Sequence, residues 1–491
     1  MTRFLPILLL AVAVTPRLPA QIAPGEYAAR RDSVAAHLHD GVLLAFGAPA
    51  PTTDEADFHQ LPSFFYLTGY SRMDAAFLMV VRGGRPVFQM LYEPPTDPRL
   101  ALYNGFPPDS AELVRRTGLG LARLSALRPF LDSTVDRGPL HVVTDVHSRD
   151  AFDDDSLTRG RRFVRDFWAV HPATTVRSAD LLLDSLRVRK GPAELALLRK
   201  AVAISVEGER AAMRRVRPGV NEGAIDALAE YTFRTAGASG PSFRAIIGSG
   251  PNSTSYHYRA NDRTMRAGEV VVMDMGALYH GYAGDVTRTV PVSGRFSSDQ
   301  AAIYRIVRAA QAAAERLARP GAQVAAGDSA VRAVEARELA RLGLIESPDA
   351  TFDPPWADST RCAPVPAPLA CRQVFLYQAH GLGHGIGLEV HDAGGYSYSP
   401  TGFFQTGEVF TIEPGIYVSR ALLDMLADTP KNRAFIAHVR KAVERYDHIG
   451  VRIEDDYLVT DDGVEWLSRA PRELEEVEAA MRGSPRAPAT R

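Results

Sequence analysis

The chain has 491 residues, of which 46% are hydrophobic and 23% are charged, and its formal net charge at pH 7 is -2. A chain of this length exceeds one ordinary hydrophobic core, so we expect two domains. The composition is ordinary for a globular protein, which argues against disorder and against a multi-pass membrane protein. The near-neutral charge also argues against nucleic acid as a partner, because a nucleic-acid-binding surface carries an excess of Lys and Arg.

The N-terminal segment has the order of a secretory signal peptide. Arg3 forms a short basic region, residues 4–14 are apolar, and Leu18-Pro19-Ala20 ends in a small residue that suits cleavage. The apolar run is too short to cross a bilayer comfortably. We therefore expect residues 1–20 to be removed and the mature protein to be secreted or periplasmic, without membrane attachment. An N-terminal anchor that is not cleaved is the alternative.

Short apolar runs separated by turn residues extend from residue 24 to residue 175 and predict an α/β domain. Strands or strand ends are expected at FFYLTGY (64–70), AAFLMVV (75–81), PVFQMLY (86–92) and LHVVTDV (140–146). The segment 111–131 has helical periodicity. The sequence of this domain contains no evident metal-binding cluster.

The junction between the two domains is expected in the segment 176–194. Its residues DLLLDSL predict a helix, and Lys190-Gly191 interrupts the pattern before Pro192, which suits the first turn of a new helix. That helix should extend to about Arg214. A further helix is expected over residues 221–237, with Asn221 as its N-cap and Gly237 as its stop.

Residues 188–470 predict a second domain of the α+β class with an antiparallel sheet. Its expected elements are strands over 270–279 and 284–292, helices over 300–321 and 326–344, and strands over 407–418 and 450–460. Groups of helices that alternate with groups of strands are typical of this class.

Four carboxylates interrupt the apolar strands of this second domain, namely those of Asp274, Asp285, Glu413 and Glu454. A carboxylate among β-branched residues is costly to bury unless it is paired or bound to metal. A single acid of this kind is usually a structural partner of an Arg or of the backbone. Four of them in one domain with a His-rich loop instead favour a metal centre.

The His-rich loop, QAHGLGHGIGLEVHD (378–392), contains His380, His384 and His391. The first two are four residues apart, as in the helical motif of zinc proteases, but the Glu that should follow the first His is missing. The four glycines of the loop also disfavour a regular helix. A nucleotide-binding loop is disfavoured too, because no Lys-Ser/Thr pair follows and the acidic residue of a dinucleotide site is missing.

These motifs together resemble one family. IIGSGPNSTSYHY, VMDMGALYHGYAGDVTRTV, HGLGHGIGLEVHD, TIEPGIYV and GVRIEDDYLVT follow one another as in the metallopeptidases of family M24, which have the creatinase or pita-bread fold. Within that family the chain is most similar to the Xaa-Pro aminopeptidases, over about residues 188–466. FFYLTGY resembles the family's N-terminal domain, although Gln60-Leu61-Pro62-Ser63 replaces the Arg and Asp/Asn usual just before it.

The resemblance implies a centre of two divalent metal ions with five ligands: Asp274, Asp285, His384, Glu413 and Glu454. Asp285 and Glu454 would bridge the ions, Asp274 would complete one, and His384 with Glu413 would complete the other. Four carboxylates and one imidazole suit Mn²⁺ and also accept Co²⁺, Zn²⁺ or Fe²⁺. Two ions about 3.5 Å apart can share a hydroxide that attacks a peptide carbonyl.

The resemblance also implies substrate contacts. His257 and His391 match residues that hydrogen-bond the scissile carbonyl and stabilise the oxyanion, and His380 matches a further residue of the cleft. Glu413 is expected to shuttle a proton as well as bind metal. Arg452 could pair with a carboxylate of the site. A purely structural role stays open for Arg452 and for each of these histidines.

The implied activity is removal of the N-terminal residue from peptides whose second residue is Pro. The closest alternative is a prolidase, which cuts only Xaa-Pro dipeptides; a Met-specific aminopeptidase is another, although such enzymes usually lack a separate N-terminal domain. A non-catalytic binding protein on the same fold is disfavoured because all five metal ligands are present. Similar enzymes are often dimers or tetramers, so a homo-oligomer also stays open.

The only two cysteines, Cys362 and Cys371, lie in one segment that is rich in Pro and turn residues. A metal site would need more partners at tighter spacing. Export favours a local disulfide between them, and two unpaired thiols are the alternative.

Overall fold

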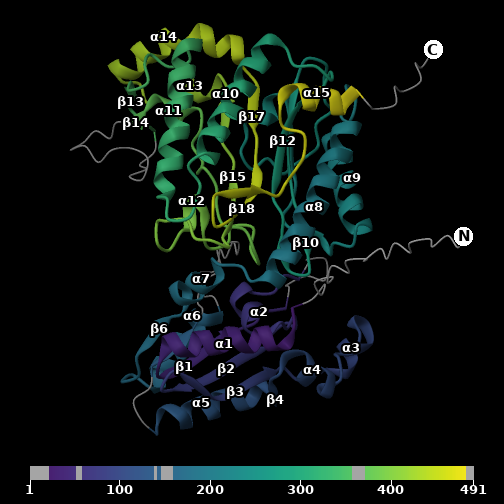
Figure 1. Cartoon of the computed structure of the whole chain (residues 1–491), viewed down its shortest axis with the longest axis vertical. Coiled ribbons are helices and arrows are strands. Elements are labelled where there is room, and N and C mark those ends of the chain that lie inside the picture. Colours follow the sequence, from purple (N-terminus) through teal and green to yellow (C-terminus); the bar gives the residue numbers. More distant parts are fainter. Residues whose placement is uncertain (1–21, 51–57, 138–140, 145–158, 356–370, 483–491) are drawn as a thin grey trace, which may run out of the picture.

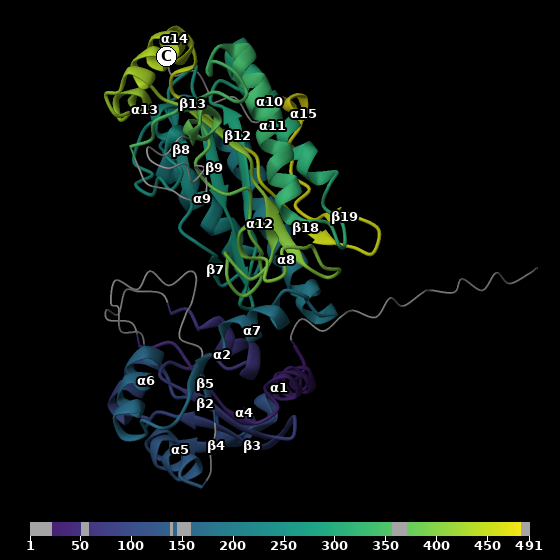
Figure 2. The same cartoon turned by 90° about the vertical axis from the view of Figure 1, so that its left-hand side faces the viewer.

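The computed structural model describes residues 22–50, 58–137, 141–144, 159–355 and 371–482. The expected signal segment 1–20 lies outside these residues. Figure 1 shows a smaller N-terminal domain below a larger C-terminal domain, with α7 (Asp180–Arg187) between them. The view turned by 90° shows the same two bodies (Figure 2). Within the described ranges, no helix combines the length and the apolar character that a membrane crossing requires.

The N-terminal domain is built on one six-stranded mixed sheet of order β4-β3-β2-β1-β5-β6. Side chains of β1 alternate between two cores, since Leu43 packs with one group of helices and Leu44 with another. The sheet is therefore covered on both faces, which confirms the α/β architecture. The strands are β1 (Gly41–Phe46), β2 (Ala76–Arg82), β3 (Arg85–Glu93), β4 (Gly120–Arg123), β5 (Val142–Thr144) and β6 (Val176–Ser178).

The helices of this domain cover the two faces of the sheet. Besides α7 they are α1 (Pro24–Leu38), α2 (Pro62–Thr68), α3 (Pro98–Asn104), α4 (Ser110–Thr117), α5 (Leu127–Val135) and α6 (Arg159–Val170). The N-terminal domain was expected to end at residue 175, and β6, which belongs to its sheet, begins one residue beyond that boundary. The helix α7 matches the helix predicted from DLLLDSL.

Two sequence-based expectations for this domain are wrong. FFYLTGY lies mostly in the helix α2 and not in a strand. Pro62 fixes a backbone angle that suits the first helical turn, and Gly69 ends the helix with a φ of 64°, so these local signals outweigh the strand preference of the aromatic run. The segment 111–131 is not one helix, because Gly118 ends α4 with a φ of 67° and β4 and α5 follow.

The C-terminal domain contains antiparallel sheets between helices, as expected for the α+β class. Its two main sheets have the orders β12-β9-β8 and β15-β18-β19, and a backbone bridge between Thr287 and Glu454 connects them. The strands are β7 (Gly240–Pro241), β8 (Ile246–Ser249), β9 (Val270–Met275), β10 (Ala277–Tyr279), β11 (Tyr282–Ala283), β12 (Val286–Pro291), β13 (Thr351–Phe352), β14 (Cys371–Arg372), β15 (Val409–Ile412), β16 (Gly415–Val418), β17 (Ile449–Arg452), β18 (Asp455–Val459) and β19 (Val464–Trp466).

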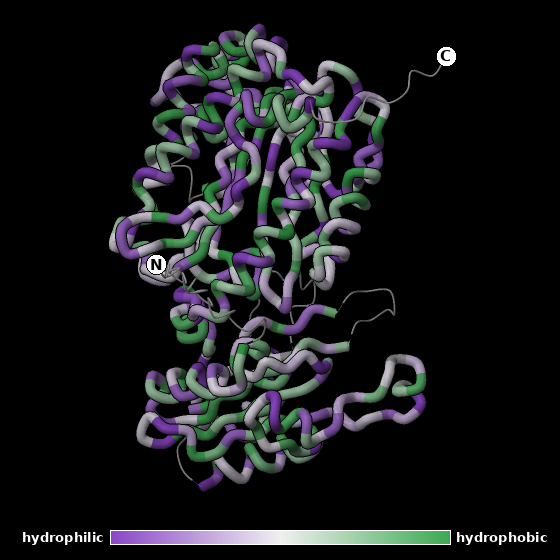
Figure 3. The backbone as a smooth tube through the Cα atoms, turned by 45° about the vertical axis from the view of Figure 1, so that its right-hand side comes forward, coloured by the Kyte–Doolittle hydropathy of each residue, from purple (hydrophilic) through white to green (hydrophobic). Residues whose placement is uncertain are grey.

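The helices of the C-terminal domain enclose these sheets (Figure 1), and Figure 3 shows hydrophobic stretches of the backbone inside the domain. They are α8 (Pro192–Arg215), α9 (Glu222–Thr235), α10 (Ser298–Glu315), α11 (Val324–Leu342), α12 (Gly395–Tyr398), α13 (Ala421–Asp424), α14 (Pro430–Tyr446) and α15 (Leu474–Arg482). As predicted, α8 begins at Pro192, and the Asn221 side chain caps α9 by accepting from the Gly223 N–H.

Cys371, at the start of β14, is disulfide-bonded. Cys362 lies outside the described residues but is the only other cysteine of the chain. Within one chain it is therefore the one available partner, in agreement with the predicted local disulfide.

Candidate metal centre

Strands from both main sheets bring the four predicted carboxylates to one buried centre. Asp274 lies on β9, Asp285 directly precedes β12, Glu413 directly follows β15, and Glu454 separates β17 from β18. In the backbone register Asp274 is opposite Thr287, and Thr287 bridges to Glu454. The pairing of the strands therefore sets the acids next to one another although they are far apart in the sequence.

His384 faces three of these carboxylates. Its Nε2 lies 3.6 Å from Asp285 Oδ2, 3.6 Å from Glu413 Oε1 and 3.9 Å from Glu454 Oε1. Its Nδ1 lies 3.1 Å from the Gly385 carbonyl oxygen, so a proton on Nδ1 directs the lone pair of Nε2 toward the carboxylates. Asp285, His384 and Glu454 each offer a ligand atom, and these atoms lie within 4.8 Å of one another.

Asp274 has a cationic neighbour. The Arg452 guanidinium, which is buried, forms an ion pair with Asp274 and donates a 2.8 Å hydrogen bond to the Tyr417 hydroxyl. The sequence left open which carboxylate Arg452 would pair with, and the structure identifies Asp274. A contact between Arg452 and substrate stays a prediction.

The residues present fit a pair of divalent cations. Asp274 Oδ1 and Asp285 Oδ1 are buried and have no hydrogen-bond partner in the described part of the chain. Such oxygens are costly unless a cation binds them, and hard divalent ions prefer carboxylate oxygen with some imidazole nitrogen. The donor set predicted from the sequence therefore meets the chemical requirement of a two-metal site.

Burial, together with crowding of negative charge, changes the protonation of these acids. Burial and the neighbouring Glu454 raise the pKa of Asp285 and of Glu413 well above their usual values. Burial, followed by the charge of Asp274, raises the pKa of Glu454 to about 7. Divalent cations favour the opposite, charged forms, so protons and metal ions compete for this centre.

Two of the predicted substrate-binding histidines lie around the same centre. The His391 ring centroid is 4.5 Å from that of His384, at a steep interplanar angle. His257 follows the short 3₁₀ helix Gly250–Thr254 and is exposed. Although part of the ring is exposed, desolvation of the remainder, and next the positive charge of Arg452, lower the pKa of His257, so its imidazole is neutral near pH 7.

The third histidine, His380, is held by an aromatic group that the sequence did not predict. Its Nε2 lies 2.9 Å from the Tyr417 hydroxyl, and its ring contacts those of Tyr256 and Tyr417 edge-on. Thr287, also not predicted, donates a 2.7 Å hydrogen bond to Glu454 Oε2. In the sequence, Tyr256 and Thr287 are marked only by their positions next to predicted site residues. Tyr256 adjoins His257, and Thr287 lies two residues after Asp285.

The glycines of the His-rich loop permit close backbone approach. A Cβ atom would lie 2.1 Å from the Thr411 carbonyl oxygen at Gly383, and 2.2 Å from the Ala393 carbonyl oxygen at Gly385. Real Cβ atoms do not come so near to backbone oxygen. The glycines therefore serve the packing of the loop around His384, and residues 378–392 form no regular helix.

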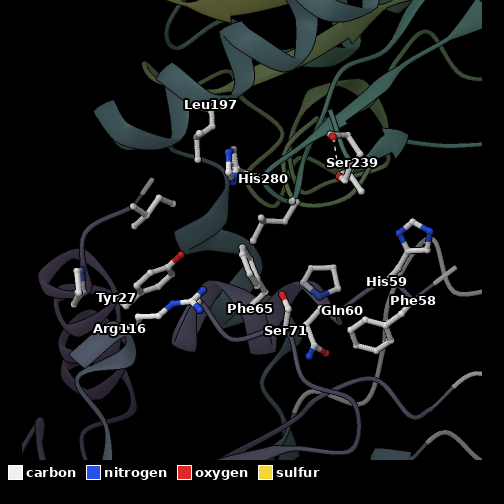
Figure 4. A pocket seen from close by; sticks show the side chains of 17 residues that line it. Tyr27, Phe58, His59, Gln60, Phe65, Ser71, Arg116, Leu197, Ser239 and His280 are labelled. Carbon is white, nitrogen blue, oxygen red and sulfur yellow. Dashed lines mark hydrogen bonds between the residues drawn. The ribbon is translucent and has the colours of Figure 1, made fainter. Parts of the chain in front are cut away.

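A separate pocket of about 420 Å³ lies between the two domains (Figure 4). Tyr27, Phe65 and Arg116 of the N-terminal domain face Leu197 and His280 of the C-terminal domain. None of the predicted site residues is among those that line it. The pocket is therefore distinct from the metal centre.

Two family models match the chain. The model of metallopeptidase family M24 matches residues 196–461, and the model of the aminopeptidase P N-terminal domain matches residues 27–137. The first match spans more than half of the chain and includes all five predicted metal ligands.

Individual proteins are similar over most of the chain. The Xaa-Pro aminopeptidase of Escherichia coli (strain K12) is 30% identical over 479 residues, which are 94% of this chain and 98% of the relative. The human Xaa-Pro dipeptidase is 33% identical over 320 residues, 61% of each chain. Among solved structures, proline aminopeptidase P II from Yersinia pestis has a TM-score of 0.75 at 26% identity, covering 94% of this chain and 100% of its own. Zinc-substituted E. coli aminopeptidase P in complex with product has a TM-score of 0.74 at 26% identity, covering 95% and 100%.

Proposed function

The chain belongs to metallopeptidase family M24, and on this premise we propose that it is an Xaa-Pro aminopeptidase, which removes the N-terminal residue from peptides whose second residue is Pro. The observation that carries the proposal is similarity through both domains: the E. coli Xaa-Pro aminopeptidase matches 94% of this chain. The buried acids and His384 add the metal centre that such a hydrolase requires.

Two divalent ions would be held by Asp274, Asp285, His384, Glu413 and Glu454, and we propose Mn²⁺ as the native ion because the set is rich in carboxylate oxygen. When bound, the ions would polarise the scissile carbonyl and supply a nucleophile at neutral pH.

The protein's own side chains would manage the substrate and the proton. Neutral His257 can donate to the carbonyl oxygen as it gains negative charge, and His391 would be a second donor. Glu413 is the most exposed of the four carboxylates, with 17% of its side chain accessible against 10% or less for the others. This exposure suits Glu413 for passing a proton from the attacking water to the departing amine.

Proline at the second position suits such a site. An Xaa-Pro bond has no N–H, and the ring fixes the backbone, so a protease that holds its substrate through that N–H cannot bind it productively. A site that grips the carbonyl oxygen and the free α-amine avoids this requirement, and a cleft shaped for the ring uses its rigidity for positioning. We expect His380 and His391 to border the ring.

An aminopeptidase is favoured over a prolidase because the similarity to the human dipeptidase is limited to 61% of each chain. Substrate length tests this choice. The manganese-loaded enzyme should release the first residue from Xaa-Pro-Yaa tripeptides and from longer peptides. Activity confined to Xaa-Pro dipeptides would establish the prolidase.

We further propose that the protein is exported, after removal of residues 1–20, to the periplasm or the medium. A disulfide at Cys371 supports an oxidising compartment. N-terminal sequencing of the fractionated protein should find a start near residue 21. The family resemblance also supports a homo-oligomer, which sedimentation analysis would detect; a monomer would contradict it.

A further inference from the structure

Four charged side chains are buried together where the two domains join. Arg187 ends α7 and Lys190 precedes α8, while Glu389 and Asp392 belong to the His-rich loop. Their side chains are only 1–4% exposed. Arg187 Nη2 lies 2.9 Å from Glu389 Oε2 and 2.6 Å from Asp392 Oδ1, and Lys190 Nζ lies 3.4 Å from Asp392 Oδ2.

Buried ion pairs often contribute little net stability, because desolvation offsets their attraction. What they do fix is geometry, since removing one partner leaves a buried charge without compensation. Here the two cations come from the segment between the domains, and the two anions come from the loop that carries His384 and His391. The ion pairs thus connect the interdomain segment to the candidate metal centre.

Asp392 links these ion pairs to the backbone around His384 and His391. Its carboxylate also accepts hydrogen bonds from the backbone N–H groups of Leu388 and Ala393, at 3.2 and 2.7 Å. Its own N–H donates to the carbonyl oxygen of Gly385, the residue after His384, at 2.8 Å. The orientation of Asp392 therefore sets the path of the backbone on both sides of His391.

Gly387 leaves room for this carboxylate. A Cβ atom at Gly387 would lie 1.9 Å from Asp392 Oδ2 and 3.1 Å from Lys190 Cε, so a side chain there would displace the ion pair. The backbone that carries the cations is equally fixed. The Lys190 N–H donates to the Gly407 carbonyl oxygen at 2.9 Å, and Arg189 forms a backbone bridge with Glu408.

We propose that Arg187, assisted by Lys190, is a positioning residue for His391: it holds Asp392 and so keeps the imidazole where the substrate carbonyl reacts. The proposal rests on the proposed function, since it concerns turnover of the same site. Without the charge of Arg187, Asp392 and Glu389 are left less compensated in a buried place. The loop then shifts, and a displacement of about 1 Å can slow an enzyme on the order of 100-fold.

A double-mutant cycle tests this. Arg187→Met, His391→Ala and the combined variant are compared by kcat, KM, metal content and melting temperature, with manganese and an Xaa-Pro-Yaa peptide. Arg187→Met should lower kcat roughly 10- to 100-fold with KM and metal content little changed. In the His391→Ala background it should have no further effect, because both changes remove the same contribution. Arg187→Lys, which keeps the charge, should restore part of the rate.

Arg30→Met is the matched control. Arg30 is also buried between the domains, but its partners are Glu26, Glu194 and the Tyr66 carbonyl oxygen. This variant should lower the melting temperature and leave kcat unchanged.

Wild-type kcat in Arg187→Met, or an equal loss in the wild-type and His391→Ala backgrounds, would overturn the proposal. If Arg187→Met does not fold, Asp392→Asn, which removes the charge from the other side of the ion pair, passes through the same cycle with the same criteria. A wild-type enzyme inactive on Xaa-Pro-Yaa peptides would instead refute the proposed function.

Discussion

Asp285 and Glu454 are the acids whose loss should be most severe, because each lies against His384 and would contribute its negative charge to holding the metal ions. Asp285→Asn and Glu454→Gln keep the shape of the side chain but lose its charge. Each should therefore lower metal occupancy. Each should also lower kcat on the order of 100-fold or more, because a ligand to the metal ions loses its charge. Metal analysis and kcat of the purified variants check this.

His391→Ala is the comparison for these variants. It should retain the metals and slow turnover by about 10²- to 10³-fold, because it removes a donor to the oxyanion and no ligand. Full metal content with normal turnover in Glu454→Gln would show that the metal centre lies elsewhere.

The raised pKa of Glu454 predicts how stability depends on pH. The folded chain without metal keeps this proton up to about pH 7, whereas the unfolded chain loses it near the usual value of 4.5. The stability linked to this proton is therefore present below the unfolded pKa and lost as pH rises through 7. The melting temperature of chelator-treated protein should fall between pH 5 and pH 8.

Manganese provides the control for this pH effect, because a bound cation favours the charged carboxylates. The metal-loaded protein should lose less stability over the same pH range, and metal binding at pH 6 should release protons. A chelated protein whose stability rises from pH 5 to pH 8, with no proton release on metal addition, would contradict the account.

At the scale of residues, the carboxylates and His384 were predictable because they interrupt apolar strands and a glycine-rich loop. Tyr417 and Thr287 were not, since they are ordinary strand residues by composition. Their contacts with Arg452 and Glu454 depend on strand register, which a sequence without its pairing partners does not specify.

At the scale of elements, the His-rich loop depends on glycines that pack against it, such as Gly395 at the start of α12. A Cβ atom at Gly395, whose φ is +63°, would lie 2.4 Å from the His384 carbonyl carbon. Gly395→Ala should therefore displace His384, lower metal affinity and cost more than the roughly 1–2 kcal/mol of the left-handed backbone alone. Metal titration and urea unfolding measure the two effects.

Gly402→Ala is the matched control for this change, because Gly402 has a similar φ of +75° and open space around its Cβ position. Its free energy of unfolding should fall only by the amount that the left-handed backbone costs an alanine, and it should bind metal normally. Equal metal affinity in the two variants would show that the close approach at Gly395 is unimportant.

The disulfide is a second element-scale feature. Cys371→Ser should lower the free energy of unfolding by about 2–3 kcal/mol, since the bond to Cys362 would close a short loop. Denaturant unfolding with and without reductant checks this, and reductant should not affect the variant. Two titratable thiols in the unfolded, unreduced wild-type protein would show that the bond is absent.

Elements with strong periodicity and clear caps were predictable, as α8 and α9 show. The helix α2 was not, because its aromatic residues favour a strand by propensity while Pro62 and Gly69 favour a helix. Strand propensity and helix-capping signals conflict in this segment. The helix forms, and its residues Phe64 and Leu67 pack into the core of the domain.

At the scale of the whole molecule, two domains and their α/β and α+β classes followed from length and from the order of elements. The contacts between the domains did not. Arg187 and Asp392 are 205 residues apart, and nothing in the pattern around either predicts that they meet. The pocket between Tyr27 and His280 likewise arises only from docking of the finished domains.

The proposed enzyme is a metal-dependent hydrolase that requires Pro at the second position. The decisive measurement is release of the first residue from matched Xaa-Pro-Yaa and Xaa-Ala-Yaa peptides, before and after Mn²⁺ is added to chelator-treated enzyme. We predict rapid release from the proline peptide only, and only with metal. Metal-dependent cleavage of both peptides at equal rates would refute proline specificity, and cleavage that persists under chelation would contradict the metal centre itself.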